Sequence, residues 1–136
     1  MSEATRQRSI VLILARDLAS TLATPMLVVD ADGHVLYYNE AAGETLGRPF
    51  NEAAPLTREE LLRGFHPTDE QGQPVSFEEM PLGVALTQRQ PSHRALSIID
   101  ADGETRHVEV TAFPLYARSD ELVGGVAVFW GRPGGR

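Results

Sequence analysis

The sequence predicts an α+β fold: a five-stranded antiparallel sheet with short helices between its second and third strands, preceded by an N-terminal amphipathic helix. Two apolar, β-prone segments near the N-terminus are joined by a tight-turn signal. A middle region follows that carries helix caps and short amphipathic stretches. Three longer β-prone segments complete the chain. Helices grouped between runs of strands are typical of α+β domains.

Composition restricts the chain to few classes of protein. Its 136 residues suit a single domain. The sequence contains no cysteine, which excludes disulfides, thiolate metal sites and photochemistry through a cysteinyl–flavin adduct. It also contains no lysine, which excludes Schiff-base catalysis and a phosphate-loop lysine.

Charge and hydropathy argue against nucleic acid and membrane as partners. A net charge of −7 disfavours binding to a nucleic-acid duplex, and the arginines are spread along the chain. No apolar run approaches the ~20 residues that cross a bilayer. The apolar stretch at 10–14 is soon followed by Arg16 and Asp17 and is too short for a secretory signal. We therefore expect a cytoplasmic protein.

Residues 3–22 are expected to form the N-terminal helix. Four apolar residues follow helical spacing: Val11, Leu14, Leu18 and Leu22. Ile10, Leu12 and Ile13 fall outside this stripe, so the apolar surface is wider than one packing face requires. The helix either lies in a groove of its own domain or packs one face on its own sheet and another on a partner subunit.

Residues 26–30 and 34–38 are expected to form the first two strands. The turn between them, Asp30–Gly33, combines an aspartate with a glycine that accepts positive φ. Both segments are apolar on both parities, so we expect both faces of this hairpin to be covered. Asn39 is then placed to cap a helix that Gly47 ends.

The middle region, residues 48–75, contains one short helix. Thr57 and Glu60 have the spacing of a capping box, and Gly64 is expected to end the helix that they open. Residues 65–74 are polar and rich in turn formers, which indicates a surface loop.

A second capping box, Ser76–Glu79, is expected to open the helix before the third strand. Pro81 suits its first turn, and the helix is expected to reach about Gln90, where Pro91 stops it.

The C-terminal part is predicted to be antiparallel β structure. Strands are expected at 93–99, 105–113 and 122–130, with a second hairpin turn at Asp100–Gly103. Pro114 is expected to break the second of these strands, because proline lacks the N–H that a sheet ladder needs.

The ordered motifs resemble those of PAS domains, the sensory and dimerisation modules of bacterial signalling proteins, and specifically the sensor-box subtype. The resemblance spans roughly residues 23–130. The motifs that carry it are Asp30–Gly33, Val35–Asn39, Ala41-Ala42, Leu46-Gly47, Glu79–Leu82, Asp102-Gly103, Phe113–Leu115 and Gly124–Val126.

The resemblance divides the chain into an N-terminal helix (1–22) that caps the domain or dimerises, a PAS-like domain (23–131) and a flexible tail (132–136). It implies that the short helices cover one face of the sheet and that the N-terminal helix or a second subunit covers the other. Because the segment before the first strand often contacts a partner subunit in PAS proteins, a homodimer is expected. The candidate interface residues are Ile10, Val11, Ile13, Leu14 and Leu18.

The resemblance also implies a ligand pocket between the sheet and the helix before the third strand. A small apolar ligand suits its expected lining, in which the Tyr38 hydroxyl is the one obvious polar group; the alternative is that these side chains only fill the core. The helix at 80–90 contains no histidine, which disfavours haem. The pocket candidates are Leu27, Val29, Leu36, Tyr38, Leu82, Ala85, Leu86, Leu96, Ile98, Val108 and Val110.

No catalytic or metal site is predicted, and the chain is not expected to be an enzyme. His34 and His66 fall in turns, and His93 and His107 on neighbouring strands lack a carboxylate at regular spacing. The two Asp-Ala-Asp-Gly turns hold only half of a calcium-loop pattern. The expected role is sensory: ligand or partner binding that regulates an effector in trans or in a longer parent chain. The alternative is a ligand-free dimerisation scaffold.

Overall fold

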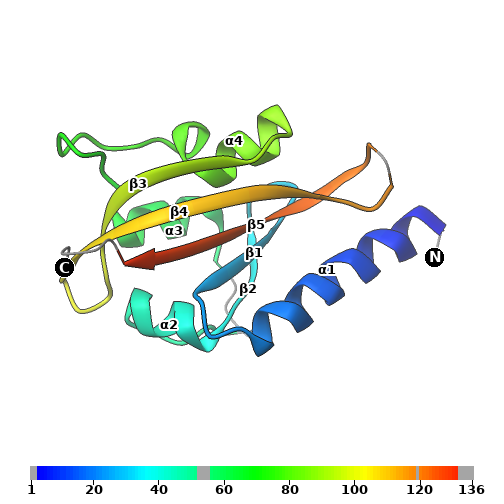
Figure 1. The fold of residues 1–136 in the computed structure, drawn as a ribbon, viewed down its shortest axis with the longest axis horizontal. Coiled ribbons are helices and arrows are strands. Elements are labelled where there is room, and N and C mark those ends of the chain that lie inside the picture. Colours follow the sequence, from blue (N-terminus) through cyan, green and yellow to red (C-terminus); the bar gives the residue numbers. More distant parts are fainter. Residues whose placement is uncertain (1–2, 52–55, 119, 132–136) are drawn as a thin grey trace.

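The computed structural model describes residues 3–51, 56–118 and 120–131 (Figure 1). The predicted tail, 132–136, lies outside the described residues. The predicted order of elements is confirmed: a helix, two strands, short helices and three strands. The elements are α1 (Glu3–Thr21), β1 (Met26–Asp30), β2 (Val35–Tyr38), α2 (Glu40–Leu46), α3 (Arg58–Phe65), the 3₁₀ helix η1 (Phe77–Glu79), α4 (Pro81–Gln88), β3 (Ser92–Ile99), β4 (Thr105–Tyr116) and β5 (Leu122–Gly131).

The five strands form one antiparallel sheet, as predicted, in the order β2-β1-β5-β4-β3. The first and last strands in sequence, β1 and β5, therefore pair at the centre of the sheet. The helices α2, α3 and α4 lie between β2 and β3 in sequence, and β2 and β3 form the two edges. None of the described helices is long and apolar enough to cross a membrane.

Each face of the sheet is covered by different helices. On the inner face, Leu27 and Val29 belong to a core cluster that also contains Leu46 of α2, Phe65 of α3 and Leu82 of α4. On the outer face, a second cluster forms beneath α1, whose long axis runs beside β1 and β5 in Figure 1. The prediction that both faces of the first hairpin are covered is confirmed. The outer cluster contains Ala15, Ala19, Met26, Val28 and Val126.

A β-bulge changes which residues of β2 face the core. Leu27 pairs with Tyr38 and Val28 with Tyr37, but Val29 pairs with Val35, so Leu36 has no opposite residue. A bulge reverses the alternation of side chains beyond it, and Val35 rather than Leu36 is buried with Val29. Leu36 is 36% exposed. Leu36 therefore does not lie on the face of Leu27, beside which it was expected to line a pocket.

Two alanines, together with Leu12, attach α1 to the sheet. Ala15 and Ala19 are buried, and Leu12 packs against the same cluster. Of the predicted stripe, Leu14, Leu18 and Leu22 are exposed, whereas Val11 is half-buried. Alanine at the contact lets the helix backbone approach the strands closely, which leaves the larger side chains on the far side of the helix.

The strand β4 continues through Pro114 to Tyr116, so the predicted break at Pro114 was wrong. Beyond Ala112, which faces Ser92, β4 pairs only with β5, where Pro114 lies opposite Gly125. Proline is tolerated where one side of a strand lacks a neighbour, because no ladder bond is lost there.

The helices of the middle region also differ from the prediction in detail. Gly64 lies inside α3, which ends one residue later at Phe65. The box at Ser76–Glu79 caps η1, and α4 begins separately with Pro81 in its first turn. The two helices pack so closely that a Cβ on Gly83 would lie 1.8 Å from the Phe77 carbonyl oxygen.

Candidate functional site

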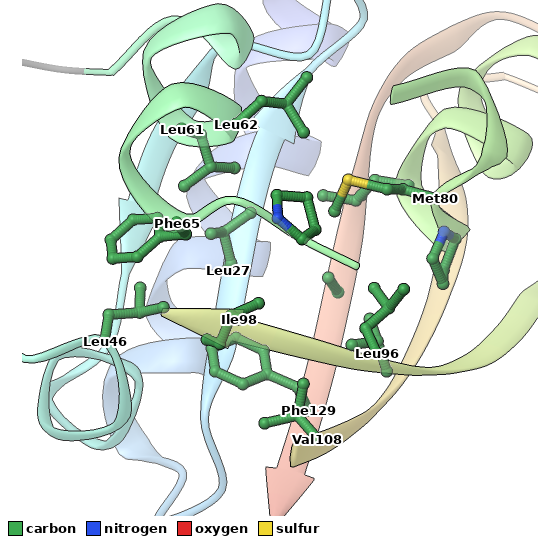
Figure 2. Close-up of a pocket in the computed structure, with 15 residues that line it drawn as sticks. Leu27, Leu46, Leu61, Leu62, Phe65, Met80, Leu96, Ile98, Val108 and Phe129 are labelled. Atoms are coloured by element: carbon green, nitrogen blue, oxygen red, sulfur yellow. The ribbon is translucent and has the colours of Figure 1, made fainter. Parts of the chain in front are cut away.

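An apolar cavity lies on the inner face of the sheet, between the sheet, α3 and the start of α4. Its free volume is about 80 Å³. Figure 2 shows Leu61, Leu62 and Phe65 of α3 facing the strands across this space. Every side chain that lines it is aliphatic, aromatic, methionine or proline. The lining therefore offers no charged group and no strong hydrogen-bond donor to an occupant.

Part of the predicted pocket lines this cavity. These residues are Leu27, Leu82, Leu96, Ile98, Val108 and Val110. Val29, Tyr38, Ala85 and Leu86 are buried in the surrounding core cluster but do not line the cavity. Leu36 is exposed at the bulge of β2 and contributes nothing to it. A ligand-binding role for the lining residues stays a prediction.

The sequence analysis missed the wall that α3 contributes. Leu61, Leu62 and Phe65 line the cavity, as do Leu46 of α2 and Met80 before α4 (Figure 2). The sequence signal for α3 is the i, i+1, i+4 spacing of these apolar residues after a capping box, which gives a short helix one apolar face. The remaining unpredicted lining residues are Pro67, Pro81, Ala127 and Phe129.

Hydrogen bonds fix α3 at both ends over the cavity. Its capping box is formed as predicted: Glu60 N–H donates to the Thr57 hydroxyl over 3.1 Å, and Thr57 N–H donates to the Glu60 carboxylate over 3.0 Å. The second of these bonds lowers the pKa of Glu60. Just before the helix, the Leu56 carbonyl accepts from Val35 N–H of β2.

After α3 the chain attaches to the opposite edge of the sheet. His66 ends the helix in a left-handed conformation with φ of 46°. Thr68 then exchanges two 2.9 Å backbone hydrogen bonds with Ser97 of β3. The segment that carries α3 therefore crosses the inner face from the β2 edge to the β3 edge and closes the cavity against the sheet.

The Tyr38 hydroxyl is not the polar group of the cavity, contrary to the prediction. It donates to the Arg48 carbonyl over 3.0 Å, and burial raises its pKa. The Arg48 guanidinium stands 5.6 Å from the centre of the Phe65 ring. The Tyr38 hydroxyl therefore joins β2 to the segment after α2, and the Arg48 side chain from that segment contacts α3.

His34, His93 and His107 each lie beside a different polar side chain. His93 Nε2 lies 2.7 Å from Glu109 Oε1, beside the Trp130 ring, whereas His107 Nδ1 lies 2.7 Å from the Ser97 hydroxyl. His34 Nδ1 lies 3.5 Å from Asp30 Oδ2 in the first hairpin turn.

The turn at Asp30 also holds the one group of three potential metal ligands found among the described residues: Asp30, Asp32 and His34. One carboxylate oxygen of Asp30 already accepts the N–H groups of Asp32 and His34. This arrangement is that of a hairpin turn held by its aspartate.

Comparison with protein-family models finds a match to the family described as PAS fold over residues 15–130. Comparison with curated proteins finds no match. Among solved structures, the PAS domain of BvgS from Bordetella pertussis is 24% identical, with a TM-score of 0.59 and 89% of this chain and 84% of that chain covered.

Two further solved structures are similar in fold. The PAS domain of nitrogen regulation protein NR(II) from Vibrio parahaemolyticus is 16% identical, with a TM-score of 0.57 and 88% of this chain and 98% of that chain covered. The LOV domain of the blue-light activated histidine kinase EL346 from Erythrobacter litoralis is 18% identical, with a TM-score of 0.61 and coverage of 82% and 99%.

Proposed function

Since the chain belongs to the PAS fold family, we propose that it is a sensory domain that binds a small apolar ligand in the cavity. The domain dimerises through α1 and regulates an effector, either in trans or within a longer parent chain. The observation that carries this proposal is a cavity lined wholly by apolar side chains at the centre of the inner core. The regulatory role is supported by the similar fold of domains from a nitrogen regulation protein and a light-activated kinase.

The lining determines the chemical class of the ligand. Ordered water needs two to four polar partners, which this lining does not offer. A charged or strongly polar ligand would lose its hydration without replacement hydrogen bonds. The free volume of about 80 Å³ is below the several hundred Å³ of pockets that hold drug-sized ligands. A small uncharged hydrocarbon group therefore fits best.

Dimerisation is supported by the exposed side of α1. Ile10, Ile13, Leu14 and Leu18 are 47%, 56%, 61% and 54% exposed. They form the exposed stripe of α1, which shares only Leu14 and Leu18 with the stripe expected from the sequence. Phe113 and Trp130 are also exposed on the outer face of the sheet, on the same side as α1. Burial of apolar area contributes about 25 cal/mol per Å², and a contiguous exposed apolar patch marks an interaction surface.

The rival function is a dimerisation scaffold whose cavity is only an imperfection of core packing. Benzene distinguishes the two, because it is small, uncharged and apolar. A ligand that binds only the folded state at 100 times its Kd stabilises the fold by about 2.7 kcal/mol. We expect benzene to raise the melting temperature of the wild-type protein.

Two matched variants localise the effect. Val108→Phe adds a ring to the cavity wall and is expected to abolish the benzene-dependent shift. Leu36→Phe adds a similar ring at an exposed position and is expected to keep it. No shift in the wild type, or an equal shift in all three proteins, would overturn the ligand-binding function.

A further inference from the structure

We infer that Asn39 couples the docking of α1 to the position of the cavity wall. Asn39 is 3% exposed and precedes α2. Its side-chain oxygen accepts from Met26 N–H over 3.1 Å and from Ala42 N–H over 2.9 Å. Its amide nitrogen lies 3.0 Å, 3.3 Å and 2.9 Å from the carbonyl oxygens of Ala19, Leu22 and Thr24, respectively.

The amide nitrogen serves the end of α1. The last carbonyls of a helix have no partner within the helix, and α1 ends without a basic residue in its last turn. The Asn39 amide donates to this end of the chain from inside the domain. Among the described side chains, Ala15, Ala19 and part of Leu12 make the apolar contact between α1 and the sheet, and the Arg16 guanidinium lies 4.8 Å from the centre of the Tyr37 ring. The Asn39 amide adds a polar attachment to these contacts, at Ala19 in the last turn of α1 and at Leu22 and Thr24 just after the helix.

The side-chain oxygen serves the cavity wall. Met26 directly precedes Leu27, and Ala42 lies in the first turn of the helix that carries Leu46; Leu27 and Leu46 both line the cavity. A rigid, planar amide thus joins the start of β1 and of α2 to the end of α1. A shift of the wall moves the oxygen of this amide, and its nitrogen moves with it.

The consequence rests on the proposed function: occupancy of the cavity regulates the position of α1 on the sheet, and with it the position of the exposed stripe. Coupling of this kind is reciprocal, so undocking α1 must also loosen the start of α2. Both directions can be followed without a ligand by hydrogen exchange of the full chain.

The first variant is Asn39→Asp. A carboxylate keeps an acceptor for both N–H groups and remains a good helix N-cap, but in place of an N–H it turns a second oxygen toward the carbonyls of Ala19, Leu22 and Thr24 and repels them. Amides of residues 10–21 are expected to exchange at least about 10-fold faster than in the wild type. Those of residues 42–46 keep their protection, because this variant also removes the link between α1 and α2. Unchanged exchange in α1, or equal acceleration throughout the sheet, would overturn the assignment of the amide to α1.

The second variant, Ala19→Leu, displaces α1 without altering Asn39, because Ala19 is fully buried. Residues 26–27 are not used as a readout, because Met26 packs in the same cluster as Ala19. If the coupling holds, residues 42–46 lose protection although the substitution lies in α1. Retained protection there, with faster exchange in α1, would refute the coupling. Neither readout requires a ligand or a second copy, so a protein that fails the benzene test can still pass this one.

Discussion

At the scale of single residues, one turn design is used three times. In each copy an aspartate Oδ1 accepts the N–H groups two and four residues further along, and a glycine three residues after the aspartate takes positive φ. The aspartate holds the loop closed, and glycine meets the required conformation without steric cost. The pairs are Asp30 with Gly33, Asp69 with Gly72 and Asp100 with Gly103.

Two of these turns were predicted from the sequence and the third was not. The turns at Asp30 and Asp100 join segments long enough to show β-prone alternation. The turn at Asp69 closes a single bridge between Thr68 and Pro74, and so short a pairing leaves no periodic signal. Its Asp-Glu-Gln-Gly sequence was the available clue.

Gly103 allows the conformational part of this design to be measured. Its φ is +83°, and a Cβ there would meet nothing within 4 Å. Gly103→Val is therefore expected to destabilise the fold through backbone strain alone, by about 1 kcal/mol or more in urea unfolding. Gly64 of α3 is equally open but not at positive φ, so Gly64→Ala should be neutral or stabilising. Equal stability of the Gly103→Val variant and the wild type would refute the turn assignment.

Asp100 makes the stability of the second hairpin dependent on pH. Its buried carboxylate lies 2.7 Å from Arg106 Nε, and this bond, followed by that from Glu104 N–H, lowers its pKa. A lowered pKa stabilises the fold above the ordinary aspartate value of about 3.9, and the contribution is lost as the pH falls through the folded-state value.

The test compares the wild type with Asp100→Asn over a range of pH. The difference between their free energies of unfolding should be present at neutral pH and shrink progressively below about pH 4. A difference independent of pH would mean that ionisation of Asp100 does not stabilise the hairpin.

At the scale of elements, the two sides of α1 carry residues of different size. Two alanines, together with Leu12, attach the helix to its own sheet, and large apolar residues remain on the opposite side. Helical spacing identified an apolar stripe on α1 but did not show whether it faces the sheet or the solvent. A second row with similar spacing, Leu12, Ala15 and Ala19, faces the sheet instead. Close approach of helix and sheet favoured the alanines.

The exposed stripe predicts how α1 responds to a charge. Leu14→Glu places a carboxylate at the most exposed residue of the stripe, and a dimer formed through α1 should dissociate because the charge would lose its hydration on burial. Sedimentation over a dilution series measures this. Leu36→Glu makes the same change at an exposed leucine outside the stripe and should leave the dimer intact. Loss of dimer in both variants, or in neither, contradicts an interface on α1.

Most element types were predictable because they have local causes. The Asn39 cap, the capping box at Thr57 and the proline in the first turn of α4 all act within a few residues. The bulge at Leu36 and the continuation of β4 through Pro114 depend on which strands lie alongside. The sequence pattern within a single strand does not show which strands will lie beside it.

At the scale of the whole molecule, the sheet separates two faces that are covered differently. The inner face carries the cavity and the outer face carries α1. The strand side of the cavity was largely predictable, since alternation identifies the inward residues of β3 and β4. The α3 side was not, because its closure depends on attachments to both edges of the sheet.

Native mass spectrometry of the purified protein tests the central claim most directly, because it reports oligomeric state and retained small molecules together. We predict a dimer whose mass exceeds twice the chain mass of 14.9 kDa by that of a small molecule released on gentle activation. A dimer without added mass would support the scaffold function instead. A monomer without added mass would contradict both the interface on α1 and the ligand in the cavity.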